Sequence, residues 1–64
     1  MIVPNAAMKA RGVAACEALA RQYHLEANDA ADNGELRLSL MLRRAAFGAE
    51  DAAREWQTYE VWRD

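Results

Sequence analysis

The chain has 64 residues, a net charge of −2 at neutral pH and a single cysteine, Cys16. Its length limits it to one small domain over residues 1–64, and its hydrophobic content of 53% overstates the core, because 15 of those residues are alanines. The lone cysteine excludes an internal disulfide, the lack of Cys and His ligand spacing excludes a zinc site, and the acidic balance gives no general attraction to nucleic acid or anionic lipid.

The first segments carry no signal for export or membrane insertion. The opening sequence MIVPNAAMKARG lacks a basic region followed by an apolar run. The longest uninterrupted run of large apolar residues, 40–42, is far too short to span a bilayer. With only one cysteine, these features predict a cytoplasmic protein that does not contact membranes.

The first predicted helix covers residues 6–24, with Asn5 as its N-cap. Its apolar stripe is narrow and built mainly from small residues: Ala6, Val13, Cys16, Ala20 and Tyr23, with Leu19 at the edge. Gly12 lies beside this stripe. It indicates either a point where a neighbouring helix approaches closely or a tolerated surface glycine. Residues 25–33 carry Asn and Asp in turn-forming positions and predict the main loop.

The second predicted helix covers residues 33–46, starting at a capping-box-like pair, Asp32 and Glu35, and ending before Gly48. It carries large apolar side chains on two faces. One face holds Leu36, Leu40 and Phe47, and the other holds Leu38, Met41, Leu42 and Ala45. A single neighbouring helix cannot bury both faces. We therefore expect this helix to be central, with antiparallel neighbours, and its second face to form a homodimer.

The third predicted helix covers residues 49–62, with Glu50 and Asp51 in its first turn. Residues 45–64 hold two basic and five acidic residues, so the acidic character is concentrated there. Trp56 is expected in the core. Trp62 is expected either to be an exposed interface anchor or to close the end of the bundle over Met8 or Val13.

No arrangement in the sequence predicts catalysis. Cys16 and His24 would lie about 12 Å apart along one helix, at about 1.5 Å per residue, which is beyond hydrogen-bonding distance. Glu50 and Asp51 are adjacent and point in different directions. We therefore expect no enzyme activity, no catalytic or metal-binding residues and no cofactor. Cys16 is interpreted as a small buried apolar residue, and His24 as a solvated residue or a partner of the helix dipole.

The sequence thus predicts an all-α, three-helix assembly that works as a non-catalytic protein-binding module. Such a module would act by stoichiometric interaction, as an adaptor, regulator or inhibitor, in the manner of small accessory proteins of mobile elements. Its partners would be a second copy and another, unidentified protein. The predicted interface residues are Leu38, Met41, Leu42, Arg37, Arg44, Glu55, Tyr59 and Trp62.

The alternative is a small regulator of the helix-turn-helix type that binds DNA through Arg37 and Arg44 of the second helix. The third helix, which would normally read the major groove, is the acidic one. The interpretation of Arg37, Arg43 and Arg44 as ion-pair partners and dipole caps is therefore favoured, and nucleic acid is not expected as a partner.

Overall fold

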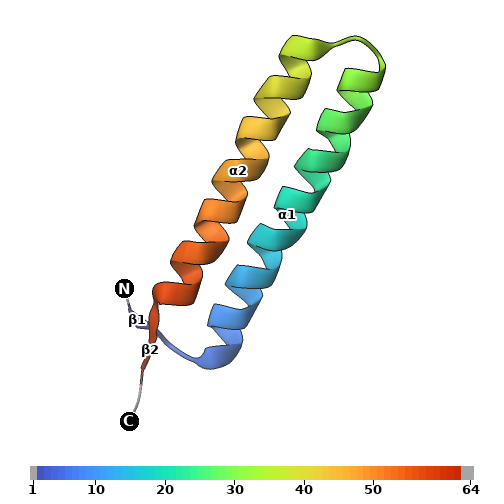
Figure 1. Cartoon of the computed structure of the whole chain (residues 1–64). Coiled ribbons are helices and arrows are strands. Elements are labelled where there is room, and N and C mark those ends of the chain that lie inside the picture. The colour runs from blue at the N-terminus through green and yellow to red at the C-terminus, as the bar shows by residue number, and fades with distance from the viewer. Residues whose placement is uncertain (1, 63–64) are drawn as a thin grey trace.

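The computed structural model describes residues 2–62 and shows two long antiparallel helices joined by a short turn (Figure 1). Helix α1 covers Ala6–Asp32 and helix α2 covers Leu36–Thr58. The short strands β1, Ile2–Val3, and β2, Glu60–Val61, pair in parallel at the end of the hairpin opposite the turn. The molecule is a thin rod of 54 × 15 × 9 Å. The predicted all-α class is confirmed.

Helix α1 begins where the sequence predicts. Asn5 is extended, and its Oδ1 accepts a hydrogen bond from the backbone N–H of Met8 at 2.7 Å. This bond satisfies one of the backbone donors that a helix leaves unpaired in its first turn. The predicted start at residue 6 is therefore confirmed together with its physical cause.

Residues 2–62 form two helices where the sequence predicts three, and two predicted boundaries are wrong. The predicted loop over residues 25–33 is helical as far as Asp32, and the predicted break at Gly48 lies inside α2. The predicted third helix is the second half of α2, which ends at Thr58 instead of residue 62. Both segments stay helical because their small residues continue the packing between the two helices, and this packing outweighs local turn preferences.

The turn over residues 33–35 depends on one glycine. Among the described residues only Gly34 has a positive φ, 77°, a conformation that side chains disfavour. Its N–H donates to the carbonyl of Ala31 at 3.0 Å. The predicted capping box of Asp32 and Glu35 is wrong, because the Glu35 side chain makes no capping hydrogen bond and α2 begins one residue later.

Alanines fill the interface between the two helices. Six residues that are buried there, which we call the alanine seam, are Ala20, Ala27 and Ala30 from α1 and Ala46, Ala49 and Ala53 from α2. On α2 they are three and four residues apart, and on α1 they are seven and three apart with the half-buried Tyr23 between the first two, which is the pattern of a coiled coil. Methyl groups let the two backbones approach closely. Near the turn, the Ser39 hydroxyl donates to the carbonyl of Ala27 at 2.8 Å.

Gly12 is a point where α2 approaches α1 closely. This confirms the first of the two interpretations of Gly12 and excludes a tolerated surface glycine. A Cβ at this position would overlap the indole ring of Trp56 from α2. At Gly48, by contrast, an added Cβ would meet no atom within 4 Å. The two glycines therefore have opposite structural roles, although both lie inside helices.

We expect Gly12→Ala to lower the free energy of unfolding by about 1–3 kcal/mol, because the new methyl group must displace the Trp56 ring. Gly48→Ala is expected to raise the same quantity by up to about 1 kcal/mol through better helix propensity. Urea denaturation followed by circular dichroism measures both. Equal effects of the two substitutions would contradict the packing of Trp56 on Gly12.

Candidate protein-binding face

The large apolar side chains of α2 lie outside the alanine seam. Leu36 and Leu40 are each 66% exposed, and Met41 is 63% exposed. Leu38 and Phe47 are about half exposed. Neither of the two predicted apolar faces is fully buried in the single chain: the first is exposed, and in the second only Leu42 and Ala45, next to the buried Ala46, are half-buried.

One of these faces extends along the whole hairpin. Leu38, Ala45 and Ala52 recur every seven residues on α2, Tyr59 continues this spacing as the residue just after the helix, and Gly12 and Leu19 have the same spacing on α1. Seven residues make two turns of a coiled-coil helix, so each row follows one side of its helix. We call these six residues the apolar face; Met41 and Leu42 flank its α2 row. Leu19 is 44% exposed and Leu38 is 45% exposed.

Acidic side chains border the apolar face near the turn. A shallow groove of about 360 Å³ there is lined by Leu38 and Leu42 and by the acidic residues Glu26, Asp29 and Glu35. Because carboxylates surround the two leucines, this end of the face suits a partner that carries an apolar side chain beside basic ones.

The single chain exposes more surface than a folded monomer of its mass. Its accessible surface is 4924 Å², whereas about 4,100 Å² is expected for a folded protein of 7.2 kDa. The excess is about 800 Å², the area that each partner contributes to a protein–protein interface of standard size. The excess accessible surface of the hairpin therefore equals about the area that one chain buries in such an interface.

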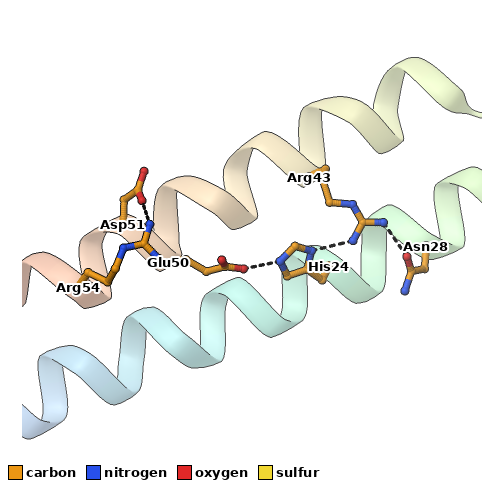
Figure 2. Close-up of polar contacts among 6 residues, drawn as sticks. All are labelled: His24, Asn28, Arg43, Glu50, Asp51 and Arg54. Atoms are coloured by element: carbon orange, nitrogen blue, oxygen red, sulfur yellow. Dashed lines mark hydrogen bonds and ion pairs between the residues drawn. The ribbon is translucent and has the colours of Figure 1, made fainter.

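The opposite edge of the hairpin carries a polar network centred on His24 (Figure 2). Arg43 Nη1 donates to His24 Nδ1 at 2.7 Å, and Arg43 Nη2 donates to Asn28 Oδ1 at 2.7 Å. His24 Nε2 lies 2.6 Å from Glu50 Oε1, and the Phe47 ring meets the imidazole edge-on at 5.6 Å between centroids. These contacts join α1 to α2 and select one tautomer: Nδ1 accepts from Arg43, so Nε2 carries the proton donated to Glu50.

This network corrects two sequence interpretations. His24 lies in the middle of α1 instead of at its end, and it binds side chains of α2 instead of the helix dipole. Glu50 lies inside α2 instead of in a solvated first turn, while Asp51 pairs with Arg54 along the same helix. No sequence signal near His24 indicates a partner 26 residues away.

The predicted interface residues fall in three places. Leu38 belongs to the apolar face, and Met41 and Leu42 flank it. Arg37 and Arg44 are exposed and lie on the side of α2 away from α1. The three remaining residues, Glu55, Tyr59 and Trp62, lie near the strand end of the hairpin.

Aromatic residues gather at this strand end. The Tyr59 ring packs 5.2 Å from that of Trp56, and burial together with the neighbouring carboxylate of Glu55 raises the pKa of the Tyr59 phenol. Trp62 is 68% exposed, and its backbone N–H donates to the carbonyl of Val3 at 2.9 Å. It lines an open groove of about 680 Å³ together with Lys9 and Tyr59. The part of the predicted acidic segment beyond residue 62 lies outside the described residues.

The described residues show neither a metal site nor a membrane-spanning helix. Residues 2–62 contain no group of three His, Cys, Asp or Glu side chains placed to hold a metal ion. Neither α1 nor α2 is long and apolar enough to cross a membrane. Comparison with known protein families, curated proteins and solved structures finds no match to this chain.

We expect Glu50→Ala and Arg43→Ala each to lower the free energy of unfolding by about 1 kcal/mol, because each removes a hydrogen bond between the two helices. Asp51→Ala is the matched control and should change it by less than about 0.5 kcal/mol, since its exposed ion pair lies within one helix. Nitrogen NMR at pH 8 should show the Nε2–H tautomer of His24. The Nδ1–H tautomer would contradict the network.

Proposed function

We propose that this chain is a non-catalytic protein-binding module that acts by stoichiometric interaction, as an adaptor, regulator or inhibitor in the cytoplasm. One observation carries the proposal: the hairpin buries alanines between its helices and leaves Met41 and every leucine except the half-buried Leu42 exposed. A contiguous apolar surface of this kind is a common mark of a protein interface. Binding of a second copy of the chain through Leu38, Met41 and Leu42 belongs to the same proposal.

The polar groups support binding over catalysis. The one histidine has a partner on each ring nitrogen, and Cys16 lies two helical turns away from it on the same helix. His24 therefore connects the two helices along one edge of the hairpin. A rigid module of this kind presents its exposed side chains in one arrangement, which lowers the entropic cost of binding.

The apolar face is tested by placing one carboxylate on it. We expect the native chain, used as bait in extracts of its host, to retain a stoichiometric partner that Leu38→Glu loses. Leu25→Glu is the matched control, because Leu25 is 68% exposed on α1 and lies outside the apolar face. Circular dichroism verifies that both variants are helical. If the two variants retain the same proteins, the apolar face is not the binding site.

The strand end offers a second binding point, where Trp62 would anchor a basic partner attracted by Glu55. We expect Trp62→Ala to cost about 2 kcal/mol or more of partner affinity with little change in melting temperature. Trp56→Ala should instead cost about 3 kcal/mol of stability, because the indole fills the space above Gly12. Calorimetry separates these effects. Equal loss of stability in both variants would place Trp62 in the fold and remove it as an anchor.

The alternative of DNA binding gains no support from the arrangement of the helices. A helix-turn-helix crosses its two helices steeply, at about 90–120°, whereas α1 and α2 run side by side (Figure 1). Arg43, one of the three arginines of this region, is engaged with His24 and Asn28. A duplex complex at physiological salt that Arg37→Ala and Arg44→Ala both weaken would reverse this ranking.

A further inference from the structure

The α2 row of the apolar face presents the same order of residue sizes from either end. Its row on α2 runs large, small, small, large: Leu38, Ala45, Ala52 and Tyr59. Its row on α1, extended by seven residues from Leu19 in each direction, reaches Gly12 and Glu26. Leu19 is therefore the midpoint of the α1 row, and the midpoint of the α2 row lies between its two alanines.

The two midpoints lie at the same height along the hairpin. Gly12 of α1 is level with Trp56 of α2, because the indole ring packs directly on it. Leu19 follows Gly12 by seven residues on α1, and Ala49 precedes Trp56 by seven residues on α2. Because the helices are antiparallel, Leu19 is level with Ala49. Ala49 lies between the two alanines of the α2 row. A single two-fold axis perpendicular to the helices can therefore pass through both midpoints.

We infer that the apolar face binds a second copy of this chain turned end for end, which gives an antiparallel four-helix bundle. This inference rests on the proposed function, because it names the occupant of the same face. Each α1 then packs on its counterpart with Leu19 against Leu19, and each α2 packs on its counterpart with Leu38 against Tyr59. Such a two-fold interface is self-complementary, as symmetric dimers require.

The distribution of charge along α1 favours a reversed second copy over one packed in the same direction. Near the strand end, α1 carries Lys9 and Arg11; near the turn it carries Glu26, Asp29 and Asp32. Reversing the second copy brings these opposite charges together along the two α1 helices. Two copies packed in the same direction would instead set α1 against the other α2 and place the carboxylate of Glu26 over leucines, which is unfavourable for an unpaired charge.

The excess accessible surface of the whole chain agrees with this occupant. A second copy that covers the excess of about 800 Å² on each chain forms an interface of standard total size, about 1,600 Å². Both chains expose Leu19, Leu38 and Met41 before they associate, so the residues covered are the large apolar ones. Gly48 lies on the flank of the α2 row, where the absence of a side chain allows close approach of the second α2.

The arrangement is tested with a spin label near the turn. Asn33→Cys in a Cys16→Ser background places one label on each chain, and pulsed electron paramagnetic resonance measures the distance between the two labels. We expect sedimentation equilibrium to give twice 7.2 kDa and the labels to lie at opposite ends, about 42 Å apart along the helices, since Asn33 is 14 residues from Leu19 at about 1.5 Å per residue. A dimer with its labels at the same end would overturn the inference.

A charge swap tests the pairing between the two α1 helices. Arg11→Glu alone and Asp29→Arg alone should each weaken the dimer about fivefold or more, and the double variant should recover most of the affinity. Arg54→Glu is the matched control, because Arg54 pairs with Asp51 on the other side of α2 and its reversal should leave the dimer unchanged. Failure of the double variant to recover, with helicity intact, would contradict the end-for-end register.

These results separate the inference from the proposed function. A monomer at all concentrations, with Leu38→Glu still losing a captured protein, would overturn the second copy as occupant and leave the binding module in place. A monomer whose captured proteins do not depend on Leu38 would overturn both. A dimer that Leu38→Glu does not weaken would place the interface elsewhere and contradict the inference directly.

Discussion

The close packing of alanine against alanine between α1 and α2 is the constraint on which the rest of this structure depends. Six alanines form the seam, and a buried alanine methyl contributes about 0.8 kcal/mol of hydrophobic free energy, against about 1.5–3 kcal/mol for a buried leucine. Small side chains bring the helices close together and leave little space for anything else. Most of the large apolar residues of α2 therefore lie on the edges of the hairpin, where they are exposed in the single chain.

The two edges of the hairpin differ in the side chains that they place beside the alanine seam. On one edge, His24 connects Arg43 and Glu50, so polar groups join the helices where the alanines provide little buried area. On the other edge, Leu19 and Leu38 remain exposed in rows that have matching midpoints. The same packing thus accounts for a rigid polar connection on one side and an unpartnered apolar face on the other.

Local signals in the sequence predict part of this structure, and long-range packing determines the rest. The cap at Asn5 and the narrow stripe of α1 follow from residue type and spacing, and the structure confirms them except for Ala6, which is exposed. The two apolar faces of α2 follow from the same spacing, but α2 has one neighbouring helix instead of two. Two helix boundaries are predicted wrongly because Asn and Asp in segment 25–33 favour a loop and because Gly48 favours a helix end. Ala27, Ala30, Ala46 and Ala49 continue the three-and-four spacing through both places, and that spacing of small residues was the available signal. The partners of His24 were not predictable, because they depend on the register between two helices.

The central claim is that the alanine seam leaves the fold dependent on covering its apolar face. The most direct measurement is the melting temperature over a hundredfold range of protein concentration, with the mass of the folded species recorded at each point. If a second copy covers the face, the melting temperature rises with concentration, because folding and association are then linked. A folded species of 7.2 kDa whose cooperative melting temperature is the same at every concentration would contradict the account.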